Sequence, residues 1–292
     1  MSVGRAIYFG FFHSISNFNN AGFDLMGNFN GLTSYVDDPF VVLTVVILII
    51  LGGLGFIVIN DIYEYSRTRR LSLHSKVVLS TSSILIVGAS VLIFIFEYSN
   101  NKTLGSLSYT GKILGSLFHS VSPRTAGSNT LSVADLTHPT LFLTILLMFI
   151  GGGSGSTAGG IKVSTFSVLI ATALTQLKGR ENVVLFKRHI VTEIILKALT
   201  VAISALMIVV AVTFLLSITE KGQNDFIIYL FEATSAFGTV GLSMGLTPEL
   251  STMGRIIIII TMFIGRLGPL TLGFAISKED KKKLIAIQRE IL

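Results

Sequence analysis

Long apolar runs constrain the fold of this chain more than any other feature of its sequence. A helix that crosses a bilayer needs about 20 mostly apolar residues. Four stretches meet that requirement: residues 39–63, 77–96, 190–218 and 255–276. A fifth, residues 138–177, is long enough but is interrupted by "GGGSGSTAGGIK" at residues 151–162, here called the interrupting loop. We therefore expect five spans, one of them broken.

Composition excludes a soluble domain. Hydrophobic residues make up 51% of the chain and charged residues 13%, whereas a soluble domain carries about 25% charged residues. The absence of cysteine excludes disulfides and thiolate metal sites. The net charge of +6 does not indicate nucleic-acid binding, because the basic residues lie between the apolar runs and not on one face. The chain is expected to be embedded in a lipid bilayer.

The basic loops predict an orientation. Lys and Arg concentrate in residues 64–76, in residues 178–188 and in the tail from residue 278, while residues 24–38 contain none. Loops rich in Lys and Arg stay on the cytoplasmic side. We expect a multi-pass protein of the cell membrane whose C-terminus is cytoplasmic and whose start lies outside.

One pattern occurs three times on the predicted outer side. The copies are "FHSISNFNNAGF", "FHSVSPRTAGS" and "FEATSAFGTVGL", at residues 12–23, 118–128 and 231–242. Each begins with Phe and then His or Glu, has Ser three residues after that polar position, and closes on two residues and a glycine. The second copy is one residue shorter between its serine and its glycine. A repeated unit of short helix, loop and span is therefore expected.

The closing tripeptides, here called glycine loops 1, 2 and 3, are candidates for binding a cation. They are Asn20, Ala21 and Gly22; Thr125, Ala126 and Gly127; and Thr239, Val240 and Gly241. The segments before them are too short to span, and irregular backbone at membrane depth must be buried in protein or line a cavity. Converging carbonyls can replace the hydration shell of a cation, as they do in the TVGYG filter of K⁺ channels. The alternative is three ordinary extracellular loops with coincidental glycines.

These residues resemble the Trk, Ktr and HKT potassium transporters, most closely the Ktr-type membrane subunit. The resemblance covers nearly the whole chain and rests on "SNFNNAGFD", "SVSPRTAGSNT", "SAFGTVGLS", "GGGSGSTAGGIKVST" and "GRLGPLTLGFA". It implies an all-α integral membrane protein of repeated helix–pore loop–helix units around a pseudo-fourfold pore, with K⁺ bound by filter carbonyls. Ser128 stands where Ktr-type subunits commonly have an aromatic residue.

The resemblance also assigns the parts of the chain to repeats. Residues 1–73 correspond to the second pore loop, its span and a cytoplasmic loop. Residues 74–189 correspond to the third repeat with its interrupted helix, and residues 190–292 to the fourth repeat and a cytoplasmic tail. Three filter loops and five spans are recognised, so the family's first repeat is expected to be missing.

The interrupting loop resembles the family's intramembrane gate. It is not a phosphate-binding loop, because Ile161 separates Gly160 from Lys162 and that motif needs Gly-Lys-Ser/Thr adjacent. Arg266 lies within an apolar stretch and, by resemblance, approaches the loop from below the filter. The alternatives are a passive kink and an arginine that snorkels to the interface. The expected gate residues are Gly151, Gly152, Gly153, Ser154, Gly155, Ser156, Thr157, Ala158, Gly159, Gly160, Lys162 and Arg266.

Other polar residues have expected structural roles. Arg124 would repel K⁺ if it faced the filter, so we expect it to point outward and pair with a carboxylate such as Glu232 or Asp24. His13, His119 and Glu232 are expected to make structural hydrogen bonds and not to bind ions. Asp61 is expected either to cap a helix or to bind a cation.

The resulting prediction is K⁺ uptake through a carbonyl filter that a glycine-rich loop gates. No Ser-His-Asp arrangement or metal-ligand cluster indicates an enzyme. The resemblance implies a homodimer, a cytosolic nucleotide-binding regulatory ring that alone would bring in a nucleotide, and Na⁺ as an activator in some members. The alternatives are a sodium or mixed-cation transporter of the same superfamily and a non-conducting membrane fragment or assembly subunit. Selectivity between K⁺ and Na⁺ stays open at this point.

Overall fold

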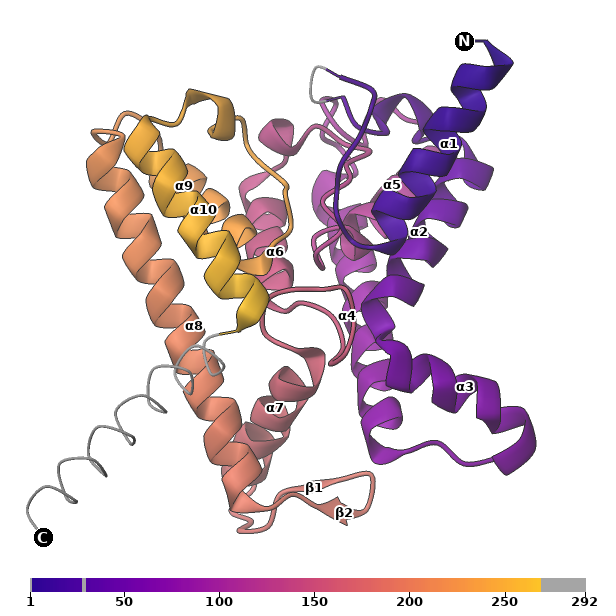
Figure 1. The fold of residues 1–292 in the computed structure, drawn as a ribbon, viewed down its shortest axis with the longest axis vertical. Helices are drawn as coiled ribbons and strands as arrows, with labels where there is room; N and C mark the ends of the chain where they lie inside the picture. Colours follow the sequence, from indigo (N-terminus) through magenta and orange to yellow (C-terminus); the bar gives the residue numbers. More distant parts are fainter. Residues whose placement is uncertain (1, 28–29, 269–292) are drawn as a thin grey trace, which may run out of the picture.

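The computed structural model of the chain describes residues 2–27 and 30–268, which fold almost entirely into helices (Figure 1). Two short strands, β1 (Val184–Leu185) and β2 (Arg188–His189), form an antiparallel hairpin. The α-helices are α1 (Val3–Phe18), α2 (Pro39–Leu54), α3 (Phe56–Thr68), α4 (Leu73–Glu97), α5 (Tyr109–Val121), α6 (His138–Phe149), α7 (Val163–Leu177), α8 (Thr192–Thr219), α9 (Phe226–Gly238) and α10 (Thr252–Leu267). The all-α class is confirmed.

The order of short helix, glycine loop, 3₁₀ turn and second helix occurs three times. Helices α1 and α2 flank loop 1, α5 and α6 flank loop 2, and α9 and α10 flank loop 3. A 3₁₀ turn precedes each second helix: η1 (Thr33–Tyr35), η2 (Val133–Asp135) and η3 (Thr247–Glu249). The repeat in the sequence is therefore a repeat of structure that extends beyond the quoted motif.

Two helices, α4 and α8, are each long and apolar enough to cross a membrane alone. Their 25 and 28 residues correspond to lengths of about 38 and 42 Å, more than the roughly 30 Å of a hydrocarbon core. They confirm continuous helices over the spans expected at residues 77–96 and 190–218. Helix α10 covers the first part of the span expected at residues 255–276. The remainder of that span and the basic tail lie outside the described residues.

The expectation of one continuous span over residues 39–63 is wrong. Helix α2 ends one residue before Gly55 and α3 begins one residue after it, with a bend of 101° between them. Gly55 has a φ of +93°, which is easy for glycine and unfavourable for other residues. The Gly53 carbonyl accepts a hydrogen bond from the Gly153 N–H at 2.8 Å. The interrupting loop therefore satisfies a carbonyl in the last turn of α2, at the point where the helix stops.

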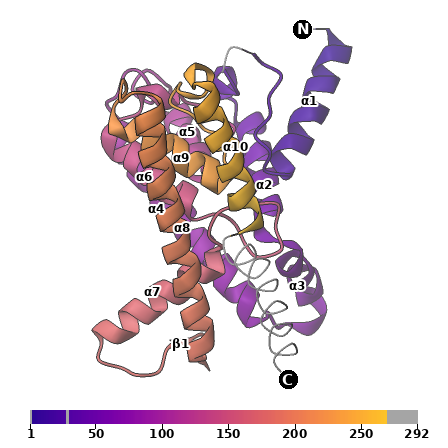
Figure 2. The same cartoon turned by 60° about the vertical axis from the view of Figure 1, so that its left-hand side comes forward.

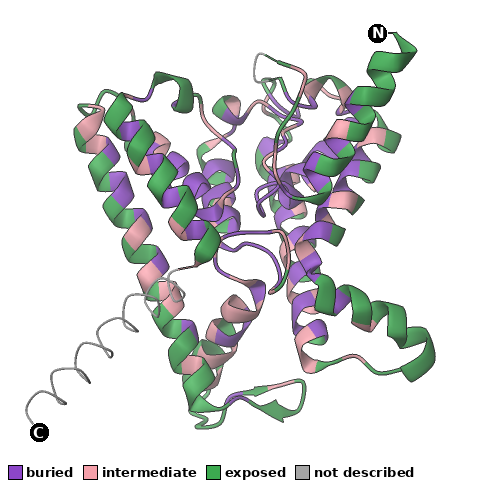
Figure 3. Ribbon diagram, in the orientation of Figure 1, coloured by how far each residue is buried: buried purple, intermediate pink, exposed green. Residues whose placement is uncertain are grey.

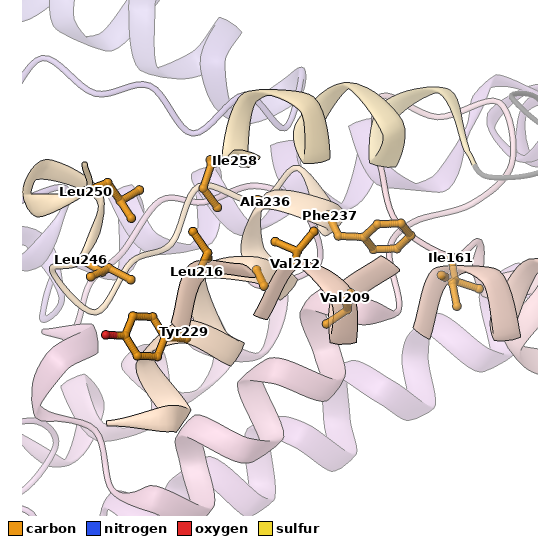
Figure 4. Close-up of a cluster of buried hydrophobic side chains, with 12 residues drawn as sticks. Ile161, Val209, Val212, Leu216, Tyr229, Ala236, Phe237, Leu246, Leu250 and Ile258 are labelled. Atoms are coloured by element: carbon orange, nitrogen blue, oxygen red, sulfur yellow. The ribbon is translucent and has the colours of Figure 1, made fainter. Parts of the chain in front are cut away.

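The largest described core joins α8, α9 and α10 (Figure 4). Tyr229 and Phe237 of α9 are almost fully buried there, beside Val209 and Leu216 of α8. Ile161 of the interrupting loop belongs to the same cluster. Apolar packing therefore fixes one end of that loop to the unit formed by α8, α9 and α10.

Buried residues lie at the centre of the molecule and exposed residues on the outer faces of the helices (Figure 3). Those outer faces are apolar: Met207, Ile259 and Phe263 are 67%, 63% and 63% exposed. Extended apolar surface is unusual on a soluble monomer, whereas it is the surface that lipid requires. Irregular backbone at the centre and apolar helix faces outside are the arrangement of a membrane protein.

A buried carboxylate joins the end of α4 to the start of α6. Glu97 is fully buried, and its two oxygens accept hydrogen bonds from the Thr103 hydroxyl (2.6 Å), the Asn100 amide (2.7 Å) and the N–H and hydroxyl of Thr137 (2.8 and 2.6 Å). Thr137 immediately precedes α6. One side chain therefore ties a spanning helix to the second helix of its repeat.

Replacing Glu97 with Ala should destabilise the protein. The change leaves the buried Thr103 hydroxyl and the half-buried donors of Asn100 and Thr137 without their carboxylate partner, at an expected cost of about 2–4 kcal/mol. Thermal unfolding of the detergent-solubilised protein should begin several degrees lower, whereas Glu64→Ala, at an exposed position of α3, should leave the midpoint unchanged. Equal midpoints for the two variants would contradict the role of Glu97.

Candidate functional site

The three glycine loops share one backbone conformation. The first residue of each has a positive φ: Asn20 (49°), Thr125 (88°) and Thr239 (52°). The closing glycine of each has one too: Gly22 (71°), Gly127 (75°) and Gly241 (96°). Because a positive φ disfavours residues with a Cβ, the repeated geometry explains the glycine that closes every loop.

A serine near the end of each short helix anchors the loop that follows. Its carbonyl accepts a hydrogen bond from the N–H of the middle loop residue, at 2.9 Å in every copy: Ser16 from Ala21, Ser122 from Ala126 and Ser235 from Val240. The second bond closes a ring one residue smaller, which accounts for the shorter second motif. The carbonyl ends of α1, α5 and α9 therefore lie beside the loops, where helix dipoles contribute negative potential.

The remaining loop N–H groups are mostly bonded as well. Asn20 and Thr239 donate to the carbonyls of Asn17 and Ala236, at 3.2 and 3.0 Å, and the Gly241 N–H donates to the Ser235 hydroxyl at 3.2 Å. In contrast, no loop carbonyl accepts a backbone hydrogen bond within residues 2–27 and 30–268. The loops therefore bond their donors to the short helices and leave their carbonyl oxygens available.

These carbonyls converge at the glycines. A methyl group built on Gly22 would lie 2.6 Å from the Ala126 carbonyl oxygen and 3.3 Å from that of Val240. A methyl group on Gly127 would overlap the Val240 oxygen and lie 3.4 Å from the Gly22 Cα. Only glycine permits so close an approach of backbones. Carbonyl oxygens of loops 2 and 3 therefore lie against the closing glycine of loop 1, so three loops from distant parts of the sequence meet in one small region.

Ser128 joins two neighbouring repeats. Its hydroxyl donates to Asn17 Oδ1 at 2.6 Å, and Asn17 in turn donates to the His13 carbonyl at 2.8 Å. The Ser122 hydroxyl donates to the Ser128 carbonyl. An aromatic residue at position 128 could not make the first bond. Ser128 therefore links the segment after loop 2 to helix α1 by a hydrogen bond.

The polar residues of the short helices make structural contacts. His13 Nδ1 pairs with the Phe9 carbonyl at 2.7 Å, and His119 Nε2 pairs with the Thr144 hydroxyl at 3.0 Å. Glu232 accepts hydrogen bonds from the hydroxyls of Ser243 (2.8 Å) and Thr247. In the described part of the chain, no three His, Cys, Asp or Glu side chains group as metal ligands would.

The expected pairing of Arg124 with Glu232 or Asp24 is wrong. Arg124 is 9% exposed, and its guanidinium donates to the Ser82 hydroxyl on α4 at 3.0 Å. Glu232 is bonded within its own repeat, and Asp24 accepts from the N–H groups of residues 26 and 27. Since both carboxylates are used locally, the arginine turns back into the protein behind loop 2.

The interrupting loop separates α6 from α7, as expected, and is closed at its base. The Gly151 N–H donates to the Ile161 carbonyl (2.9 Å), the Ile161 N–H to the Phe149 carbonyl (3.2 Å), and the Val163 N–H to the Gly152 carbonyl (3.0 Å). These bonds bring the ends of the loop together. The loop is therefore an ordered excursion from a broken helix.

The excursion lies beside the lower ends of α2 and α10 (Figures 1 and 2). The Phe56 N–H donates to the Gly155 carbonyl at 3.2 Å. A methyl group on Gly159 would lie 2.8 Å from the Gly238 carbonyl oxygen and 3.1 Å from the Thr239 Cβ. The interrupting loop thus packs against the bend after α2 and against glycine loop 3.

Two cationic side chains bond to carbonyls of the interrupting loop. Arg266 in the last turn of α10 donates to the Thr157 carbonyl, and Lys162 Nζ donates to the Ala158 carbonyl at 2.6 Å. Arg266 therefore contacts the interrupting loop, as the resemblance implied. Asp61, for which two roles were open, accepts hydrogen bonds from the Ser72 N–H (3.2 Å) and the Ser75 hydroxyl (2.5 Å), and so supports the start of α4, where Ser72 is the N-cap.

The sequence reasoning missed the partner of the interrupting loop. Residues 51–55 read "LGGLG", and carbonyls of this run accept hydrogen bonds from Gly153 and Thr157. A methyl group on Gly152 would lie 2.7 Å from the Gly53 carbonyl oxygen. A second glycine-rich run inside an apolar stretch was the available signal that two backbones pack closely there.

Known proteins resemble this chain in sequence. The sequence model of the TrkH family, described as "Cation transport protein", matches residues 3–284. The chain is 48% identical, over 94% of its length, to the "Ktr system potassium uptake protein B" of Bacillus subtilis. It is 42% identical, over 93% of its length, to the "Potassium/sodium uptake protein NtpJ" of Enterococcus hirae. It spans 60% of the length of each relative.

A solved structure shares the fold. The crystal structure of the potassium transporter TrkH from Vibrio parahaemolyticus superposes with a TM-score of 0.74, covering 90% of this chain and 57% of that one, at 18% sequence identity. Its likeness confirms the helical fold, and the matched family consists of membrane cation transporters and not of enzymes. The chain belongs to the TrkH family of cation transport proteins.

Proposed function

We propose that this chain takes part in K⁺ uptake and conducts the ion past the three glycine loops. The observation that carries the proposal is the convergence of loop carbonyls that accept no backbone hydrogen bonds. Oxygens in that arrangement replace the hydration shell of a permeating cation. The relatives named as potassium uptake proteins support the choice of ion.

The anchoring serines supply the rigidity that such a filter requires. Each holds the middle N–H of its loop, so the peptide planes cannot turn their donors toward the ion. The negative ends of α1, α5 and α9 favour a cation beside the loops. The side chains of Ala126 and Val240 are buried in separate apolar clusters behind the backbone. Loop residues thus offer carbonyls to the ion while their side chains support the ring.

The interrupting loop serves as the gate in this proposal. It packs against glycine loop 3 and carries Lys162, with Arg266 bonded to it. Two positive charges close to the conduction path disfavour a cation there. Opening requires the loop to leave α2 and Arg266, whose bonds are polar and can be replaced by water.

The finer assignments follow the family pattern. We propose a location in the cell membrane with a cytoplasmic C-terminus, a homodimer, and a cytosolic nucleotide-binding ring through which any nucleotide acts. Na⁺ is proposed as an activator and not as the main transported ion. The name "Ktr system" of one relative supports the existence of a partner subunit, and the basic residues at 64–76 and 178–188 supply a surface for it.

A sodium or mixed-cation transporter is the second candidate function, favoured by the relative named for potassium and sodium uptake. A non-conducting assembly subunit is the third candidate function, since the chain spans only 60% of the length of that relative.

Measurement of Rb⁺ and Na⁺ flux into vesicles distinguishes the three candidate functions. The chain would be tested alone and after extension with the segment that its longer relatives carry. The proposal expects Rb⁺ flux above Na⁺ flux in the extended chain, and absence of cation flux would refute it.

Replacing Gly127 with Ala in the extended chain should reduce Rb⁺ flux by roughly tenfold or more, because the methyl group overlaps the Val240 carbonyl and strains a positive φ. Gly10→Ala is the matched control, since a methyl group there meets nothing within 4 Å. It should transport normally. Normal flux through both variants would contradict the filter assignment.

Removing the charge of Arg266 should open the path. Arg266→Gln weakens the bond to the Thr157 carbonyl and removes a positive charge, so Rb⁺ flux should rise several-fold; deletion of residues 152–159 should raise it further. Arg255→Gln at the other end of α10, where the side chain bonds the Pro248 carbonyl, should have no effect. The gate assignment fails if flux is unchanged in both Arg266→Gln and the deletion.

A further inference from the structure

Thr157 in the middle of the interrupting loop bonds to three other segments of the protein. Its hydroxyl accepts a hydrogen bond from Asn20 Nδ2 at 2.8 Å and donates to the Gly52 carbonyl at 3.0 Å. Its N–H donates to the same carbonyl at 3.3 Å. Its own carbonyl accepts from Arg266. One residue therefore connects the loop to glycine loop 1, to α2 and to α10.

The Asn20 contact differs from the other two because it reaches a glycine loop. Asn20 is the first residue of loop 1, is 4% exposed, and has a positive φ, which Asn tolerates better than most residues. Its Oδ1 has no hydrogen-bond partner in the described part of the chain. The Thr157 hydroxyl is thus the one described partner of this buried side chain.

The equivalent residues of the other loops lack such a bond. The Thr125 hydroxyl is buried without a partner among the described residues, and Thr239 meets Gly159 of the interrupting loop through van der Waals contact. Only loop 1 is therefore joined to the interrupting loop by a side-chain hydrogen bond in the described residues. The bond spans 137 positions of sequence, so local chain geometry does not impose it.

We propose that Asn20 is a positioning residue that couples glycine loop 1 to the interrupting loop through Thr157. This inference rests on the proposed function and adds a link between the filter and the gate. When the interrupting loop moves, Asn20 loses its partner, and its whole amide is left buried and unpaired. An unpaired buried amide is unfavourable, so the side chain and the loop 1 backbone rearrange together with the gate.

The coupling works in both directions. A cation bound by the loop 1 carbonyls stabilises the backbone conformation that presents the Asn20 amide to Thr157, and so favours the closed position of the interrupting loop. When loop 1 loses its cation or changes conformation, the interrupting loop is released from its closed position. Coupling between two sites is reciprocal, so a change at Thr157 must also alter ion selection at loop 1, although Thr157 belongs to the interrupting loop.

Two substitutions remove the bond from opposite sides. Asn20→Gly deletes the amide and keeps the positive φ, and Thr157→Val deletes the hydroxyl at nearly constant shape. Each should raise Rb⁺ flux and lower the ratio of Rb⁺ to Na⁺ flux by several-fold in the extended chain. The double variant should differ from the wild type no more than the larger single change. If the change in flux of the double variant equals the product of the two single changes, the residues act independently and the proposal is refuted.

Conservative controls separate coupling from simple structural damage. Thr157→Ser keeps the hydroxyl and should preserve both flux and selectivity. Asn19→Gly alters the neighbouring exposed residue, whose amide bonds the Ile15 carbonyl, and should do the same. Loss of selectivity in Thr157→Ser equal to that in Thr157→Val would contradict a role for the hydroxyl.

A second measurement does not depend on transport. In the detergent-solubilised extended chain, K⁺ in place of Na⁺ should slow amide hydrogen exchange across residues 151–162 of the wild type, and Asn20→Gly should abolish that slowing. If the rate of amide hydrogen exchange in the wild-type interrupting loop is the same in K⁺ as in Na⁺, the coupling is refuted, even if the protein transports Rb⁺. Conversely, K⁺-dependent protection without flux would refute the proposed function and leave the coupling intact.

Discussion

Backbone polar groups inside a bilayer must be satisfied by the protein, and the rest of this structure depends on how that is done. The helices satisfy theirs internally. The glycine loops and the interrupting loop cannot, so they lie at the centre, away from the apolar outer faces. Within the glycine loops the N–H groups bond to the ends of the short helices. The carbonyls that accept no backbone hydrogen bonds are the groups that a cation can use.

The same requirement explains why two helices break near each other. The bend at Gly55 and the interruption after Phe149 exchange hydrogen bonds, with Gly153 and Thr157 donating to carbonyls of the last turn of α2. Each break supplies partners for the other. These bonds run between the two breaks and do not involve α4 or α8. A segment held by hydrogen bonds between loops therefore lies beside the continuous helices α4 and α8.

The sequence predicted the parts of this arrangement that are local or repeated. Apolar length identified α4 and α8, and the spacing of Ser16 and Gly22 and of its two counterparts identified the glycine loops, because each loop is closed by bonds within its own repeat. Prediction from the sequence failed where segments distant in the chain compete for one hydrogen-bonding group. Hydropathy could not show that the interrupting loop takes a carbonyl of α2, or that Arg124 would bond Ser82 once Glu232 was held by Ser243 and Thr247.

The central claim is that carbonyls of the three glycine loops bind K⁺. The most direct test is anomalous diffraction from crystals of the extended chain grown in Rb⁺, with Na⁺ crystals for comparison. The account predicts Rb⁺ density within coordination distance of loop carbonyls beside Gly22, Gly127 and Gly241, and none at those oxygens in Gly127→Ala. If wild-type crystals at saturating Rb⁺ show no anomalous density at these carbonyls, the central claim is contradicted.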